Sequence, residues 1–186
     1  MKALFFLYDG YVDWEISPLS YMLSVSDIEV TTTALSNEVV HAGNFRVRAD
    51  LPVEACDSAD YDILVIPGGE PAPVIREEHL LNLIRAFDKQ DKWIAAICGA
   101  PAFLASAGIL RDRNFTTSVA NEPEYVDYFK GMDLSETDVT VSENLITAEG
   151  NAYIEFAVAV GKELNIFKDR EDELETVLYF KNQLRG

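Results

Sequence analysis

The chain has 186 residues and carries 15 lysines and arginines against 32 aspartates and glutamates, a formal net charge of −17. A surface this acidic repels phosphate backbones and anionic lipid headgroups, which argues against nucleic-acid binding and membrane-surface binding. With 48% hydrophobic residues the chain can bury a core, and its length predicts a single domain over residues 1–186. Two cysteines are too few for a disulfide scaffold and are typical of a reducing compartment, so we expect a cytoplasmic protein.

Apolar strands and amphipathic helices alternate in the first half of the chain. Residues 2–8 form a nearly unbroken apolar run, which is typical of a parallel strand covered on both faces. Ser17 and Pro18 are typical of a helix N-cap followed by the first helical position. In chain order, the pattern predicts a strand at 2–8, a helix beginning at Ser17, a strand rich in β-branched residues at 28–35, a hairpin at 39–47 and a strand at 61–66.

The second half of the chain continues this alternation. The stretch 93–110 has no charged residue, but Gly99, Pro101 and Gly108 interrupt it, so a buried strand, a tight turn and a buried helix explain it better than a membrane span. The predicted elements are a helix at 78–89, a strand at 94–97, a helix at 101–107, short strands at 139–141 and 145–148, a helix from 151 to 164 and a last helix opened by the acidic residues 169–175.

This order of elements predicts the fold class. Strands that alternate with helices indicate an open, mostly parallel α/β sheet with helices on both faces. Such sheets place their functional sites at the carboxyl ends of the strands, so the residues that follow each strand are the candidates for chemistry.

Cys98 stands where a predicted strand runs directly into a predicted helix. Small residues, Ala96 and Ala100, lie two positions before and after it. This is the layout of a nucleophile elbow, with cysteine in place of serine. A helix N-terminus stabilises a thiolate, so we expect a lowered thiol pKa. The alternative interpretation is an inert buried cysteine, because cysteine is among the residues most often buried.

Two neighbouring strand ends carry further candidates. Gly68 and Gly69 follow the strand at 61–66, and the amide of Gly69 together with that of Gly99 is a candidate oxyanion hole, although an ordinary turn explains two glycines equally well. Glu15 follows the first strand and is a candidate acid, base or hydrogen-bond partner of the cysteine. A solvated carboxylate near a helix start is the alternative for Glu15.

The remaining polar residues predict no second centre. Only His41 and His79 could activate a thiol, and we interpret both as ordinary surface residues. Two separated cysteines and two separated histidines give no metal-ligand spacing, and no glycine-rich phosphate motif is present, so we expect no metal and no cofactor. Cys56 lies in an acidic segment that disfavours a thiolate, and we treat it as non-functional.

In combination these motifs resemble the ThiJ/PfpI superfamily of class I glutamine amidotransferase-like domains. The resemblance rests on Glu15, on residues 62–69, on residues 95–101 and on the later segments 145–150 and 155–157, and it covers nearly the whole chain, from Met1 to Phe167. It implies a flavodoxin-like three-layer sandwich and a homodimer or larger homo-oligomer. It also implies Cys98 as the reactive thiol, Glu15 as its carboxylate partner, and Gly69 and Gly99 as oxyanion donors.

The resemblance implies a cysteine-dependent enzyme that acts on a small carbonyl or amide compound, as an amidase, a hydrolase, a glyoxalase or a deglycase. In protease-like members a histidine directly follows the nucleophile, whereas Gly99 stands there in this chain, and no histidine occurs after His79. Glu15 alone would then serve as both acid and base. The alternatives are an oxidative-stress-responsive protein in which Cys98 is oxidised without hydrolytic activity, and a non-catalytic binding module.

The last predicted helix bears on assembly. Leu174, Val177, Leu178 and Lys181 lie along one of its faces, which makes this stripe mainly apolar. The stripe either packs on the parent sheet or forms a contact between two copies of the chain.

Overall fold

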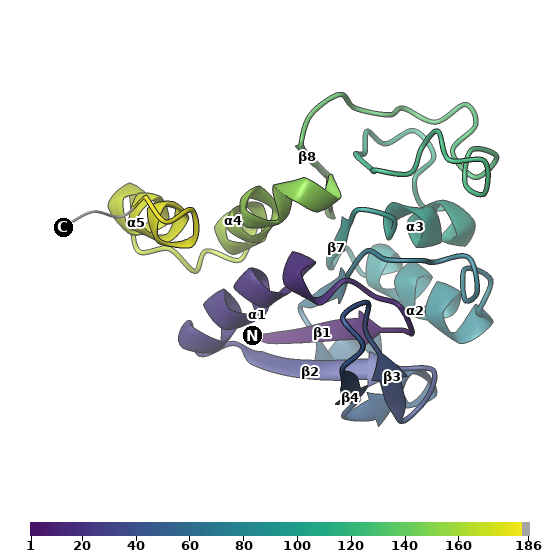
Figure 1. Cartoon of the computed structure of the whole chain (residues 1–186), viewed down its shortest axis with the longest axis horizontal. Helices are drawn as coiled ribbons and strands as arrows, with labels where there is room; N and C mark the ends of the chain where they lie inside the picture. The colour runs from purple at the N-terminus through teal and green to yellow at the C-terminus, as the bar shows by residue number, and fades with distance from the viewer. Residues whose placement is uncertain (184–186) are drawn as a thin grey trace.

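The computed structural model describes residues 1–183 and contains a central sheet with helices on both of its faces (Figure 1). The strands of this sheet are β1 (Lys2–Leu7), β2 (Glu29–Ala34), β5 (Leu51–Pro52), β6 (Ile63–Ile66), β7 (Trp93–Ile97), β8 (Val139–Ser142) and β9 (Leu145–Ala148). Their spatial order is β5-β2-β1-β6-β7-β9-β8, and each neighbouring pair is parallel except β8 and β9. The predicted flavodoxin-like α/β fold is therefore confirmed.

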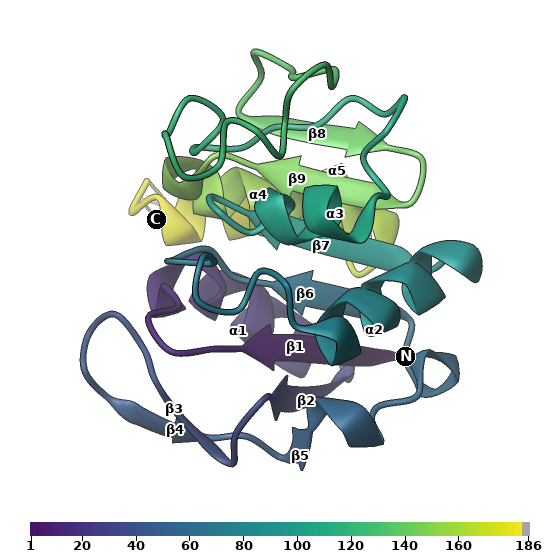
Figure 2. The same cartoon turned by 90° about the vertical axis from the view of Figure 1, so that its right-hand side faces the viewer.

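The helices form the two outer layers. Helices α1 (Ser17–Val25) and α4 (Tyr153–Glu163) pack together on one face, and α2 (Glu78–Lys89) and α3 (Pro101–Ala107) pack together on the other (Figure 2). Strands β3 (Glu38–Val40) and β4 (Arg46–Arg48) form the predicted hairpin beside the sheet. The order brings the carboxyl ends of β1, β6, β7 and β9 to one edge of the molecule.

Burial on both faces of the sheet explains why several strands are unbroken apolar runs in the sequence. Every residue of Ile63–Ile66 in β6 is fully buried, and so are Ala3, Leu4 and Phe6 of β1. Strands covered on both faces have no solvent side, so β6 has no polar residue, and the one polar residue of β9, Thr147, is buried with its hydroxyl oxygen accepting the Thr116 N–H. Phe87 from α2, Phe103 from α3 and Phe156 from α4 fill the spaces between the sheet and its helices, and all three are fully buried.

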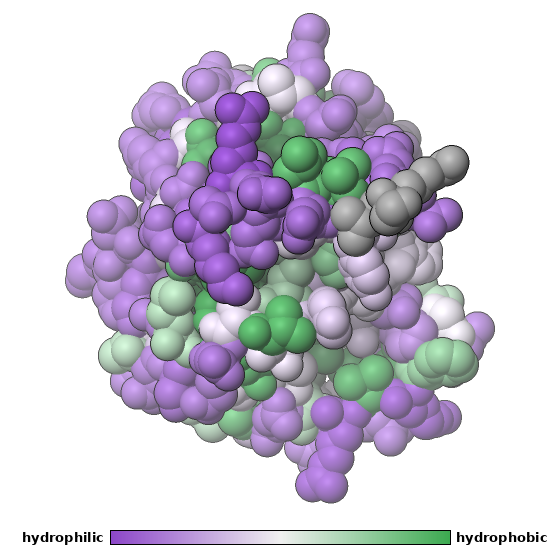
Figure 3. Space-filling view, turned by 90° about the vertical axis from the view of Figure 1, so that its left-hand side faces the viewer, coloured by the Kyte–Doolittle hydropathy of each residue, from purple (hydrophilic) through white to green (hydrophobic). Residues whose placement is uncertain are grey.

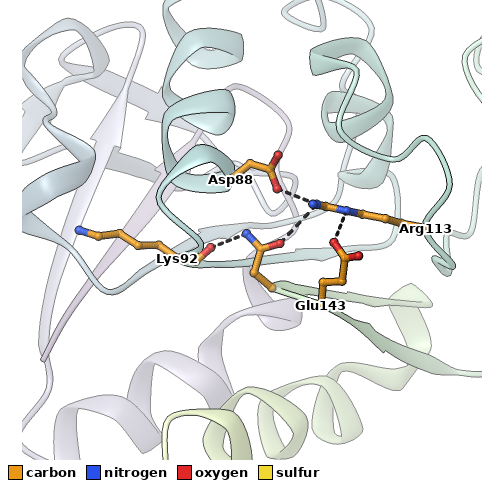
Figure 4. Close-up of polar contacts among 5 residues, drawn as sticks. Asp88, Lys92, Arg113 and Glu143 are labelled. Carbon is orange, nitrogen blue, oxygen red and sulfur yellow. Dashed lines mark hydrogen bonds and ion pairs between the residues drawn. The ribbon is translucent and has the colours of Figure 1, made fainter.

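A polar cluster holds together the edge of the sheet opposite these carboxyl ends. Arg113 forms ion pairs with Asp88 (2.6 Å) and with Glu143 (2.7 Å), and it also contacts the side-chain oxygen of Asn144 at 3.3 Å (Figure 4). The Asn144 amide donates to the backbone carbonyl of Lys92 at 2.9 Å. The cluster therefore ties α2, the start of β7 and the turn between β8 and β9 to one arginine.

One long connection, residues 108–138, lacks helices and named strands and lies above α3 in Figure 2. Phe115 and Phe129 stack with ring centroids 5.3 Å apart, and both are buried. A single bridge joins Phe115 to Leu134. These contacts hold the connection together although it has no regular secondary structure. Its sequence therefore shows neither a helical nor a strand period.

Two helix predictions need correction in detail. Ser17 is the first residue of α1 and not its N-cap, because its hydroxyl points back to the Asp13 carbonyl (2.7 Å) and Ile16 occupies the cap position. The last helix, α5 (Arg170–Phe180), begins as predicted with acidic residues, and the Asp169 side chain accepts N–H groups of Glu171 and Asp172. It packs against α4 and not on the sheet, and none of its residues is buried.

The face that carries α1 and α5 exposes apolar atoms among hydrophilic ones (Figure 3). A cavity of about 570 Å³ opens between these helices, and Tyr21, Phe167 and Tyr179 are among its lining residues. In the part of the chain that the structure describes, no helix is both long and apolar enough to cross a bilayer.

Candidate active site

Cys98 occupies a sharp turn between β7 and α3. Its backbone has a φ of +63°, a left-handed conformation that costs a non-glycine residue roughly 1 kcal/mol or more. The Cys98 N–H donates to the carbonyl of Ala148 at the end of β9 (2.8 Å), and α3 begins three residues later at Pro101. The thiol is half-buried. The strand, strained turn and helix of a nucleophile elbow are therefore present around this residue.

Two glycines allow other strand ends to approach the cysteine closely. A Cβ atom on Gly68, just after β6, would lie 2.4 Å from the Cys98 Cβ and 2.4 Å from Glu15 Oε2. A Cβ atom on Gly150, after β9, would lie 2.9 Å from the Cys98 Sγ and 2.8 Å from Glu15 Oε1. Only glycine fits at these two positions, because any side chain would occupy the space of the thiol and the carboxyl.

Glu15 reaches this space from a short 3₁₀ turn, Asp13–Glu15, that follows β1. Its side chain is only 3% exposed, its Oε2 accepts the Gly68 N–H at 2.8 Å, and its carboxyl lies within hydrogen-bonding reach of the Cys98 thiol. Burial raises the pKa of this carboxyl from its usual 4.5 to about 7, although the hydrogen bonds from Cys98 and Gly68 oppose that rise. The alternative of a solvated carboxylate is therefore wrong.

The expected lowering of the thiol pKa is also wrong. Burial, with the nearby Glu15 charge, raises the pKa of Cys98 to about 12, and the opposing hydrogen bonds from Ser118 and Gly99 do not outweigh them. The two groups titrate as a pair, which holds a single proton between about pH 7 and about pH 12. In that range the proton lies on the sulfur and Glu15 is a carboxylate, so Glu15 can accept the proton when the sulfur reacts.

Gly69 and Gly99 lie side by side at the mouth of this site. Gly69 has a φ of +128°, and a Cβ atom on Gly99 would lie 3.0 Å from the Gly69 carbonyl oxygen. Within residues 1–183, neither amide donates to a backbone carbonyl, whereas the amide of Gly68 is occupied by Glu15. The Gly99 N–H donates toward the Cys98 sulfur, whereas the Gly69 N–H has no backbone acceptor among the described residues, and the role of both amides as oxyanion donors stays a prediction.

The two histidines do not join the site. His41 is buried and not on the surface as expected: its Nδ1 accepts the Gly43 N–H at 2.9 Å, and its ring packs against Tyr11 and Phe45. His79 lies exposed on α2, as expected, and lines a separate cavity together with Cys56. Neither imidazole is among the groups that act on the Cys98 thiol.

Sequence reasoning missed Ser118. Its hydroxyl donates to Glu149 Oε2 at 2.5 Å, accepts the Gly150 N–H at 2.9 Å and lies within hydrogen-bonding reach of the Cys98 thiol. Its own N–H donates to the Cys98 carbonyl at 3.1 Å, which fixes the two residues side by side. Ser118 lies in the irregular connection, where the only signal was a run of three hydroxyl residues, 116–118.

Four cavities of about 360 to 570 Å³ are among those that the described residues form, and none of these four is lined by Cys98. No group of three or more His, Cys, Asp or Glu side chains among residues 1–183 is arranged to hold a metal ion.

The chain is similar to known proteins over most of its length. The family model described as "DJ-1/PfpI family" matches residues 1–163. An uncharacterized protease, YdeA of Bacillus subtilis, is 31% identical over 180 residues, which cover 96% of this chain and 89% of that protein. The deglycase TK1284 of Thermococcus kodakarensis is 25% identical over 150 residues, which cover 80% of this chain and 89% of that protein.

A solved structure shows the same fold over the full length. The DJ-1 superfamily protein Atu0886 from Agrobacterium tumefaciens superposes with a TM-score of 0.83 at 26% identity, covering 99% of this chain and 100% of that one. The family match spans most of the chain and includes the three strand ends that meet at Cys98. The chain therefore belongs to the DJ-1/PfpI family.

Proposed function

We propose that this protein is a cysteine-dependent enzyme that acts on a small carbonyl or amide compound, with Cys98 as nucleophile and Glu15 as the group that carries the proton. The observation that carries the proposal is the buried Glu15 carboxyl. This carboxyl has a pKa of about 7 and lies beside the Cys98 thiol, which is held on a strained elbow. A general base is most effective when its pKa is close to the working pH.

The first chemical step follows from this arrangement. The Cys98 sulfur attacks the electrophilic carbonyl carbon and forms a C–S bond, while the thiol proton moves to the Glu15 carboxylate. The carbonyl π electrons move to its oxygen, and the amides of Gly69 and Gly99 donate to the resulting oxyanion. Glu15 then holds the proton that the next step requires, either for the oxyanion or for a leaving amine.

The relatives indicate which reaction classes to test. One is named an uncharacterized protease and another a deglycase, so acyl transfer and carbonyl chemistry are the two classes to compare. With no imidazole at the sulfur, one carboxyl must carry the proton in both directions. This favours reactions in which the proton returns to the same small molecule.

The test compares the wild type with Cys98→Ala and with Cys56→Ala, using methylglyoxal and a small amide as substrates. We expect turnover of at least one substrate by the wild type and by Cys56→Ala, and background turnover by Cys98→Ala. Equal, background-level turnover by all three proteins would reject the enzymatic proposal for those substrates.

Oxidation of Cys98 is a second candidate function. The sulfur is half-exposed and lies beside the Gly99 amide, which can donate to an oxygen added to it. Intact mass after mild peroxide, followed by peptide mapping, tests this candidate. We expect added oxygen at Cys98 before Cys56, and oxidation of Cys56 alone would reject it.

We further propose a homo-oligomer in a reducing compartment such as the cytoplasm. Exposed apolar residues on α1 and α5, among them Tyr21, Val25, Leu174 and Tyr179, support a contact between copies, and the two free cysteines support the compartment. Sedimentation of the wild type and of Leu174→Asp tests the contact. An oligomer that survives this substitution excludes α5 as its interface.

A further inference from the structure

The Ser118 hydroxyl has one proton to donate and two possible acceptors for it. Its oxygen already accepts the Gly150 N–H at 2.9 Å, and its proton is donated to Glu149 Oε2 at 2.5 Å. The Cys98 sulfur lies next to the same Gly150, where a Cβ atom would be 2.9 Å from it, and a hydrogen bond from Ser118 lowers the pKa of this thiol. The sulfur needs a donor whenever it becomes a thiolate. A hydroxyl has only one proton to donate, so Glu149 and the thiolate compete for it.

The backbone keeps all three groups in place for this competition. The Ser118 N–H donates to the Cys98 carbonyl at 3.1 Å, and the Thr117 hydroxyl donates to the same carbonyl at 2.6 Å. Gly150 donates its N–H to the Ser118 oxygen and lies against the thiol. Rotation about a single side-chain bond therefore redirects the Ser118 proton while the main chain stays still. Glu149 is half-buried, so water can replace the hydrogen bond that it loses.

We propose that Ser118 is a further catalytic residue, which donates its hydroxyl proton to Glu149 at rest and to the Cys98 thiolate during reaction, and that Glu149 is a positioning residue that limits this donation. The inference rests on the proposed function, because it assigns the third group acting on the same sulfur. No covalent bond changes at Ser118: the thiol proton goes to Glu15, and the serine only exchanges one hydrogen-bond acceptor for another.

This arrangement predicts opposite effects for the two residues. Ser118→Ala removes the donor from the thiolate, so the thiolate is less populated and reacts more slowly. Glu149→Gln replaces a carboxylate by an amide, a weaker acceptor, so the hydroxyl is released to the sulfur and Cys98 reacts faster. In the Ser118→Ala background, Glu149→Gln has no hydroxyl to release, and its effect disappears.

The experiment measures the rate at which iodoacetamide alkylates Cys98, resolved by peptide mass, in the full chain near neutral pH. We expect Ser118→Ala to be about fivefold slower than the wild type, Glu149→Gln to be about threefold faster, and the double variant to match Ser118→Ala. Ser118→Thr keeps the hydroxyl and is expected to restore the wild-type rate. The Cys56 rate in the same samples reports whether each variant is folded.

A charge control separates the hydrogen bond from simple electrostatics. Glu70→Gln removes a carboxylate at the same edge of the sheet, where Glu70 accepts from Tyr125 and not from Ser118. We expect this variant to change the Cys98 rate by less than Glu149→Gln does. Equal acceleration by both variants, acceleration by Glu149→Gln in the Ser118→Ala background, or slower alkylation in Glu149→Gln would each overturn the inference.

Alkylation does not require a substrate, so the two proposals fail separately. Loss of the opposite effects on alkylation rejects the role of Ser118 and Glu149, whatever the turnover. Equal turnover by wild type and Cys98→Ala rejects the enzymatic function, whatever the alkylation rates.

Discussion

The two cysteines of this chain differ less in burial than in their neighbours. Both are half-buried, and burial raises the pKa of both thiols. The Cys56 thiol contacts the Thr33 hydroxyl oxygen at 3.2 Å and the Pro52 carbonyl at 3.7 Å. Cys98 lies against the Glu15 carboxyl and the Ser118 hydroxyl.

This comparison shows what prepares a buried thiol for chemistry. A hydroxyl oxygen and a carbonyl can hold the proton of Cys56 but cannot take it near neutral pH, because neither is a base there. The Glu15 carboxylate can take the proton of Cys98, since burial has brought its pKa to about 7. The same burial that raises the thiol pKa therefore also prepares the base that compensates for it.

Gly68→Ala should produce the largest change. The added methyl group would lie 2.4 Å from both the Cys98 Cβ and Glu15 Oε2, so the thiol and carboxyl must move apart. We expect turnover to fall about 100-fold and the free energy of unfolding to fall by about 1–3 kcal/mol. Gly43→Ala is the matched control, because its Cβ would clash at 2.7 Å with the His41 ring, away from the sulfur. Turnover that survives Gly68→Ala but is lost in Gly43→Ala would contradict the assignment of the site.

Glu15→Gln should remove a pH dependence of stability that comes from the buried carboxyl beside Cys98. The folded-state pKa of Glu15 is raised from 4.5 to about 7, so the neutral acid favours folding. Its stabilising contribution is fully present below about pH 4.5 and is lost as the pH rises through about 7. We expect the wild-type free energy of unfolding to fall by about 2 kcal/mol more than that of Glu15→Gln across this range. Denaturant unfolding at several pH values measures this, and parallel curves for the two proteins would refute it.

Glycine substitution should have opposite effects at the two cysteines. Cys98 has a φ of +63°, which glycine adopts without strain, whereas Cys56 has a φ of −82°. We expect Cys98→Gly to be about 1 kcal/mol more stable than Cys98→Ala and Cys56→Gly to be roughly 0.5 kcal/mol less stable than Cys56→Ala. Thermal or denaturant unfolding of the four variants decides the matter, and the same sign at both positions would show that the elbow is not strained.

The sequence predicted those features that depend on local pattern. The unbroken apolar run of β6 indicated a buried parallel strand, and the small residues around Cys98 indicated an elbow, because both follow from what fits at one position. The sequence also indicated Glu15, 83 positions earlier in the chain, as the partner of Cys98, but the raised thiol pKa was not predicted, because it depends first on how deeply the fold buries the sulfur and then on the Glu15 charge. The burial of His41 depends in the same way on contacts with Tyr11.

Ser118 illustrates a second limit on prediction. It lies in a connection without helices or named strands, where the contacts include the stacking of Phe115 on Phe129 and follow no helical or strand period. Glu149 and Gly150, its two partners, come from the end of a different strand. A hydrogen-bonded contact assembled from two such segments, 31 and 32 positions apart in the chain, leaves no spacing that a sequence pattern can reveal.

The pH profile of site-resolved alkylation shows whether Glu15 takes the proton of Cys98. If it does, the Cys98 rate rises up to about pH 7 and is then flat, because the pair keeps its remaining proton until about pH 12. The Cys56 rate should rise throughout, and Glu15→Gln should give Cys98 the same continuous rise. A wild-type Cys98 rate that rises steadily through pH 7, in parallel with Cys56, would show that Glu15 does not take this proton.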